Sequence, residues 1–153
     1  MKIEINCRFS EKVLFSHEVE NNTTRLTVEA AVKARANLVG AYLAGANLAG
    51  AYLDRANLDG ANLAGAYLDR ANLAGAYLDG ETLTKAPLSL LNLTWPVLVT
   101  EGYMRIGCQR HTHAEWAEFD TDAIEAMESR APNFWSQWRD VLLSMCAKHA
   151  EVE

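Results

Sequence analysis

The chain has 153 residues, half of them apolar, and a formal net charge of −6, which is enough sequence for one compact domain with its own core. It contains no apolar run of membrane length and no basic stripe, which argues against a membrane span and against direct binding to nucleic acid. Three widely spaced cysteines do not form a disulfide framework, and the first residues lack the apolar segment of a signal peptide, so we expect a cytoplasmic protein.

Residues 1–35 are predicted to form a cap made of a β-hairpin and a short helix. Ile3 and Ile5 alternate with polar neighbours, and a polar turn at 10–12 leads to a second apolar run that begins at Val13. The polar stretch 21–24 can then begin a helix of one or two turns. The segment that follows, from residue 36, is repetitive. Because the end of a stack of repeats must be covered, we expect residues 1–35 to close its first turn.

The segment from Ala36 to Gly80 consists of nine consecutive pentapeptides: ANLVG, AYLAG, ANLAG, AYLDR, ANLDG, ANLAG, AYLDR, ANLAG and AYLDG. The first position is always Ala and the third is always Leu, whereas the other three positions vary. A period of five fits neither a helix nor a strand, which predicts a repeat architecture of stacked cross-sections. The constant Leu and Ala are expected to point inward and to fill each layer of the stack.

These pentapeptides resemble the pentapeptide-repeat family, whose pattern is Ala, then Asn or Asp, then Leu, then two loose positions. The resemblance implies an all-β repeat core, a right-handed quadrilateral β-helix in which each pentapeptide forms one side and four make a coil. Leucines continue at the same spacing up to Leu98, so we expect the β-helix to occupy residues 36–100, with about three coils. At a strand spacing of about 4.8 Å, three coils make a stack about 15 Å tall.

The outward positions of the repeats supply most of the predicted interaction surface. Four tyrosines stand where the family usually has Asn or Asp, and Tyr is enriched at binding hot spots, although a neutral role as surface residues stays open. Residues twenty apart should lie one above the other, which aligns Asp59 with Asp79, whereas Asp54–Arg55 and Asp69–Arg70 are expected to be solvated ion pairs. The candidate interaction residues are Tyr42, Tyr52, Tyr67, Tyr77, Asp59, Asp79 and, beyond the repeats, Trp116.

Residues 101–153 are predicted to form a C-terminal module with a hairpin strand and helices. A two-residue turn separates Val97–Thr100 from Tyr103–Ile106, which favours a hairpin. Thr112 and Asp120 are expected to cap two helices, and Pro132 to open the longest one, whose apolar residues recur at helical spacing. The acidic charge of the chain is concentrated here, with ten Asp and Glu against five Lys and Arg.

One set of residues in this module has the spacing of metal ligands. Cys108 and His111 are separated by two residues, as are Cys146 and His149, and such pairs suit a tetrahedral structural zinc ion, with His113 as a spare ligand. The alternative is that Cys146 and His149 extend the apolar side of the last helix as core residues.

We expect a protein without enzymatic activity. The His113–Glu115 pair has the H-x-E form of zinc deaminases, but the partner motif P-C-x-x-C is absent, and no phosphate loop or nucleophile elbow occurs. The flanks KIEINCRF and YMRIGCQRHTHAEW resemble those of small phage and prophage pentapeptide proteins, which implies a rigid module that binds an unidentified host or defence protein. Two alternatives stay open: a DNA mimic that inhibits or protects DNA gyrase or another DNA-binding protein, as in other members of the family, and a self-associating structural component, with a homodimer as its simplest form.

Overall fold

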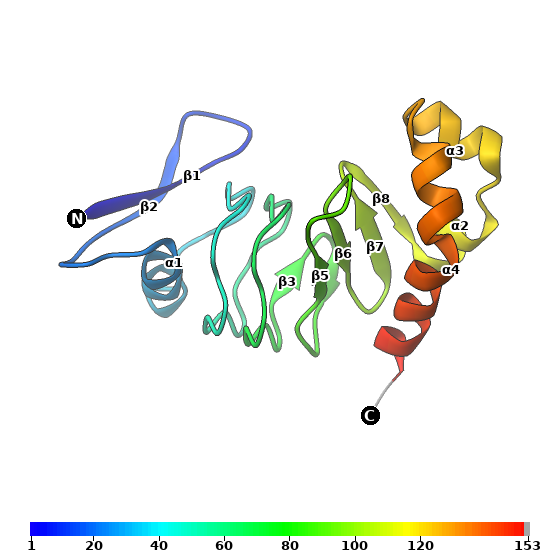
Figure 1. The fold of residues 1–153 in the computed structure, drawn as a ribbon. Helices are drawn as coiled ribbons and strands as arrows, with labels where there is room; N and C mark the ends of the chain where they lie inside the picture. Colours follow the sequence, from blue (N-terminus) through cyan, green and yellow to red (C-terminus); the bar gives the residue numbers. More distant parts are fainter. Residues whose placement is uncertain (152–153) are drawn as a thin grey trace. The chain divides into compact units, whose positions relative to one another are not determined.

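The computed structural model describes residues 1–151, which divide into two compact units, Met1–Ser89 and a second unit that begins at Leu90 (Figure 1). None of the described helices is long and apolar enough to cross a membrane. The elements of the first unit are β1 (Lys2–Asn6), β2 (Val13–Glu18), α1 (Thr24–Lys33), β3 (Tyr77–Leu78) and β4 (Glu81–Thr82). Strand β5 (Leu88–Leu90) spans the division, and the second unit continues with β6 (Val97–Val99), β7 (Tyr103–Ile106), β8 (Gln109–Thr112), α2 (His113–Glu118), α3 (Thr121–Met127) and α4 (Ala131–Ala150).

The N-terminal hairpin and helix are confirmed. Strands β1 and β2 pair in antiparallel register, and the hydroxyl of Thr23 caps α1 by accepting the Leu26 N–H at 3.1 Å. Backbone pairing then joins the hairpin to the first pentapeptides, because the Tyr42 N–H donates to the Asn6 carbonyl at 2.8 Å. Helix α1 lies between the hairpin and the first repeats (Figure 1), so the cap covers the beginning of the stack.

The pentapeptides form a β-helix-like stack with twenty residues in each turn. The Leu43 N–H donates to the Asn62 carbonyl at 2.9 Å, and the Asn62 N–H donates to the Ala41 carbonyl at 2.8 Å. Parallel bridges join residues twenty apart, such as Tyr42 and Asn62. The third-position leucines from Leu38 to Leu78 are at most 5% exposed, so they form the interior as the sequence pattern predicts.

Each pentapeptide ends in a tight turn, which explains the period of five. The carbonyl of Leu38 accepts the Ala41 N–H at 3.0 Å, and Gly40 between them has a φ of +69°. This is the pattern of a type II turn, whose third residue must adopt a positive φ, and Gly is the residue that adopts it most easily. Arg55 and Arg70 occupy the same position with φ values of 60° and 58°.

The regular stack ends earlier than the predicted residue 100, because the chain turns back on itself after β3. Asp79 and Gly80 both have positive φ and form the two-residue loop of the β3–β4 hairpin, in which Leu78 pairs with Glu81. This is the geometry of a type I′ hairpin turn, for which Asp-Gly is a preferred sequence. Leu83 is still buried, but Leu88 is 38% exposed, so the five-residue spacing no longer marks an inward position at Leu88.

The second unit is a sheet packed against three helices. The strand order is β5-β6-β7-β8, and β6, β7 and β8 are antiparallel neighbours. The structure confirms three predicted helix signals: the N-caps at Thr112 and Asp120 and the proline in the first turn of α4. Strand β8 was not predicted from the sequence; Gly107, with a φ of 57°, lies in the two-residue loop between Ile106 and Gln109 and is the turn signal for it.

Candidate interaction surface

The four repeat tyrosines are exposed, from 40% for Tyr77 to 69% for Tyr52. Residues twenty apart share one side of the stack, and each tyrosine is paired there with an asparagine. The pairs are Tyr42 with Asn62, Tyr67 with Asn47, Tyr52 with Asn72 and Tyr77 with Asn57. The four rings therefore lie on four different sides of the stack, so a partner that docks on one side meets a single tyrosine.

The predicted alignment of residue 59 with the next turn is visible in one hydrogen bond. The Gly80 N–H donates to Asp59 Oδ1 at 3.1 Å. The Asp59 side chain is half-buried and supports the backbone of the following turn. The two aspartates thus contribute to the local structure of the stack, and they do not form a long acidic array.

The expected ion pairs Asp54–Arg55 and Asp69–Arg70 are wrong, because neither is formed among residues 1–151. The positive φ of each arginine places its side chain at a corner of the stack. There the stem of Arg55 extends towards the next turn, with its Cγ 3.3 Å from the position that a Cβ on Gly75 would take. The charges of Asp54 and Arg55 therefore remain available on the surface.

Helix α1 closes the open edge of the first turn with charged side chains. Glu29 Oε1 accepts the Tyr52 N–H at 3.0 Å, and Arg25 donates to the Ala49 carbonyl at 3.2 Å. In the interior of the stack these backbone groups would pair with a preceding turn, which does not exist here. The side chains of α1 thus satisfy the edge and block further strand pairing.

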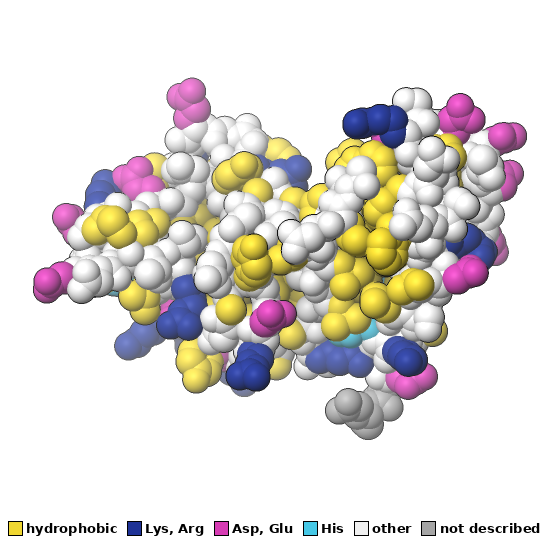
Figure 2. Space-filling model, viewed as in Figure 1, with side chains coloured by type: hydrophobic (Ala, Val, Ile, Leu, Met, Phe, Trp, Pro, Cys, Tyr) yellow, Lys and Arg dark blue, Asp and Glu magenta, His cyan; other side chains and the backbone are white. Residues whose placement is uncertain are grey.

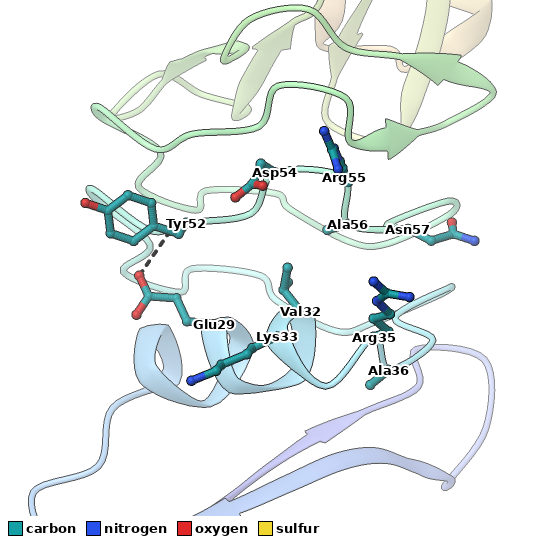
Figure 3. Close-up of a pocket in the computed structure, with 10 residues that line it drawn as sticks. All are labelled: Glu29, Val32, Lys33, Arg35, Ala36, Tyr52, Asp54, Arg55, Ala56 and Asn57. Carbon is teal, nitrogen blue, oxygen red and sulfur yellow. Dashed lines mark hydrogen bonds between the residues drawn. The ribbon is translucent and has the colours of Figure 1, made fainter.

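A groove of about 670 Å³ lies between α1 and the first turn, and we call it the α1 groove (Figure 3). It is lined by residues of both segments: Glu29, Val32, Lys33, Arg35, Ala36, Tyr52, Asp54, Arg55, Ala56 and Asn57. Tyr52 stands beside Glu29 at one end of the groove in Figure 3. The lining contains three cationic side chains and two carboxylates, so the groove is locally basic on an acidic chain.

The chemistry of the α1 groove suits binding and not catalysis. The lining has no Ser, Cys or His that could act as a nucleophile or as a general base near neutral pH. Lys33, Arg35, Asp54 and Arg55 make no ion pair and no side-chain hydrogen bond within the described part of the chain. The sequence prediction included Tyr52 but missed the α1 residues, because the helix reaches the first turn only through tertiary packing.

The placement of Trp116 on the interaction surface is wrong. The side chain is 2% exposed, and its indole N–H donates to the Met104 carbonyl at 2.7 Å. Its ring packs at 5.2 Å, measured between centroids, against that of Trp135. Trp116 is therefore part of the core of the second unit, and its position on the apolar face of a short helix explains the burial.

The four predicted zinc ligands do not form a metal site in the structure. Within residues 1–151, no group of three or more His, Cys, Asp or Glu side chains could hold a metal ion. Cys108 is exposed, whereas Cys146 is buried with its Sγ 3.7 Å from Met104 Sδ, and burial raises its pKa to about 11. His149 is also buried, and the His111 ring packs edge-on against Trp116 at 5.1 Å. The structure thus places Cys146 and His149 on the buried face of α4, as the alternative interpretation expects.

Comparison with known proteins supports the interpretation of the repeat. Residues 36–75 match the family model of pentapeptide repeats, in eight copies. The chain therefore contains a pentapeptide-repeat segment, and the matched residues belong to the β-helix-like stack described above. No curated protein and no solved structure matches the chain. Pentapeptide-repeat proteins are generally structural or interaction proteins without enzymatic activity.

Proposed function

We propose that this protein is a non-enzymatic module that binds a partner protein through the α1 groove. The observation that supports the proposal is the unpaired set Lys33, Arg35, Asp54 and Arg55, which lines the same groove as the exposed ring of Tyr52. Charges that have no partner within the chain can pair with a second protein without breaking existing contacts. An exposed tyrosine beside them supplies a rigid anchor of the kind that dominates many interfaces.

The composition of the groove defines the chemistry of the partner. Because Lys33, Arg35 and Arg55 outnumber the carboxylates, the bound segment should carry acidic side chains, with an apolar group over the Tyr52 ring. The rest of the chain is acidic, so complementary charge would also orient the partner towards this groove. The stack behind the groove is held by backbone pairing between turns, which reduces the entropy lost on binding.

The test is affinity capture from bacterial lysate with matched tyrosine variants. Tyr52→Ala removes the anchor of the groove, and Tyr67→Ala removes an equivalent repeat tyrosine from another side. We expect the wild type and Tyr67→Ala to retain the same stoichiometric protein, and Tyr52→Ala to lose it. With the purified partner, Tyr52→Ala should weaken the Kd by about 30-fold, the effect of a hot spot of about 2 kcal/mol. Equal retention by all three proteins would contradict the proposed site.

Two further parts of the proposal concern the geometry of the stack and the biological role of the module. We propose that the stack is a right-handed quadrilateral β-helix, which is supported by twenty residues, or four pentapeptides, per turn. The resemblance of the flanks supports a phage-encoded modulator of a host or defence protein that acts in the cytoplasm. A crystal structure would test the handedness. Inhibition of gyrase supercoiling that persists in a Lys33→Glu, Arg55→Glu double variant would instead favour the DNA-mimic alternative.

A further inference from the structure

The second unit contains an apolar cavity that is independent of the α1 groove. Its volume is about 100 Å³, and it lies between the β7–β8 turn, α3 and the beginning of α4. Figure 2 shows hydrophobic side chains gathered at the surface of this unit where the sheet and the helices meet. The apolar lining consists mainly of Trp95, Trp116, Phe134, Trp135, Ile124 and Met127.

The aromatic side chains around the cavity are held in fixed positions. Trp95 and Phe134 meet edge to face with ring centroids 5.3 Å apart, and the Trp116 indole is anchored by its hydrogen bond to the Met104 carbonyl. Gly107 lies at the cavity with a φ of 57°, and a Cβ there would come within 3.3 Å of Trp95 Cδ1. These walls cannot collapse without breaking ring contacts, so the space is maintained.

The cavity offers little to water. An ordered buried water needs two to four polar partners, and apolar cavities stay dry even when they are large enough to admit a small molecule. Of the polar side chains in the lining, Glu128 is bound by Arg130, whose Nε lies 3.2 Å from Glu128 Oε1, and Gln109 contacts the His111 ring at 3.4 Å. The buried indole N–H of Trp135 has no hydrogen-bond partner among the described residues, but one donor falls short of the two to four partners that an ordered water needs. The lining, which is mainly apolar, therefore favours an apolar occupant.

We propose that this cavity binds one uncharged apolar ring of about the size of benzene. An engineered apolar cavity of about 150 Å³ in another protein binds benzene, so a space of this order with partly open walls can hold a single ring. Aromatic rings pack well against the edges and faces that the three tryptophans and Phe134 present. The ring can belong to a free small molecule or to an aromatic side chain of another protein.

The tryptophans make the test direct. The chain has four tryptophans, of which Trp95, Trp116 and Trp135 line the cavity and Trp138 does not. In ¹⁵N–¹H spectra of the full chain titrated with benzene, we expect saturable shifts of the three lining indole N–H signals, with the Trp138 signal unchanged. A parallel titration with N-acetyl-phenylalaninamide tests whether the cavity accepts an aromatic side chain of another protein, because in this compound the ring is attached to a peptide backbone.

Matched variants separate binding in the cavity from binding elsewhere. Ala131→Leu adds volume to the lining, and Ala147→Leu makes the same change at an exposed site on the same helix. We expect Ala131→Leu to weaken benzene binding at least tenfold and Ala147→Leu to leave it unchanged, with Met127→Phe as a second filling variant and circular dichroism to verify folding. Saturable shifts with benzene alone would show that the cavity binds free small molecules only. Saturable shifts with both probes would show that it also accepts an aromatic side chain. Absence of saturable shifts with both probes, or equal binding by the folded filling variants, would overturn the proposal.

Discussion

Replacement of Leu58 by alanine tests whether the interior of the stack carries its stability. Leu58 has no exposed surface and lies one turn from Leu38 and one turn from Leu78, both of which are also buried. Its N–H donates to the Tyr77 carbonyl at 2.8 Å, so the backbone on either side is fixed by pairing. The neighbouring layers therefore cannot move in to fill the space left by the missing side chain. We expect a loss of about 2 to 5 kcal/mol in the free energy of unfolding of the stack.

Hydrogen exchange followed by mass spectrometry measures this loss in the stack itself. All four tryptophans lie in the second unit, so their fluorescence would not report on the repeats. A loss of about 2 to 5 kcal/mol corresponds to about 30-fold to about 4,000-fold faster exchange of amides that open with the stack, such as those of Leu58 and Tyr77. Peptides that cover residues 56–77 should show this acceleration.

Leu88→Ala is the matched control. Leu58 and Leu88 fall on the same five-residue spacing, so the sequence pattern alone predicts equal effects. Leu88 is 38% exposed in the structure, and its truncation should cost less than about 1 kcal/mol. Equal acceleration of exchange by the two variants would refute the argument that Leu88 no longer belongs to the inward leucines of the stack.

Four further outcomes are expected. Gly45→Ala should destabilise the stack by about 1 to 2 kcal/mol in denaturant titrations, because its φ of 68° disfavours a Cβ although no atom lies within 4 Å of it. Thr112→Ala should cost the second unit about 1 kcal/mol of stability. Hydrogen bonds from Thr112 lower the pKa of Glu115, so the cap stabilises the unit above the ordinary pKa of a glutamate, and this stabilisation is lost as the pH falls through the lowered pKa. Glu115→Gln should remove that acid dependence of the melting temperature. At pH 8 a thiol reagent should modify the exposed Cys108 rapidly and Cys146 only after unfolding. Burial raises the Cys146 pKa from 9.0 to about 11, so the neutral buried thiol contributes its full stabilisation of the folded state below pH 9. The free energy of unfolding should then decrease by about 2 kcal/mol between pH 9 and pH 11, and Cys146→Ala should lack this pH dependence. A strong zinc chelator should leave the melting temperature of the second unit unchanged, and a clear decrease would restore the predicted zinc site.

The repeat could be predicted from the sequence because its determinants are local. Leu at the third position and Gly at the fifth recur within five residues, and a type II turn followed by a short extended segment needs no distant contact to be specified. The cap residues Thr112 and Asp120 were found for the same reason, since each binds an amide three residues away.

The same local signal failed where two structures satisfy it. Asp59-Gly60 and Asp79-Gly80 are the same dipeptide at the same repeat position. The first continues the stack, whereas the second adopts two positive φ angles and closes a hairpin. What differs is the chain that follows, because Thr82 and Leu83 return to pair with Tyr77 and Ala76.

The sequence by itself determined the period and the inward residues, because these follow from turn chemistry and from the need to bury Leu and Ala. The twenty-residue register was expected from the resemblance to the pentapeptide-repeat family. Only the tertiary structure decided the end of the stack, the burial of Trp116, the absence of a metal cluster among the described residues and the two candidate binding sites. The α1 groove combines residues about 20 positions apart, and the cavity combines residues as far apart as Trp95 and Trp135. Such contacts depend on how whole elements pack, and packing depends on side chains from several segments at once, so no local pattern specifies it.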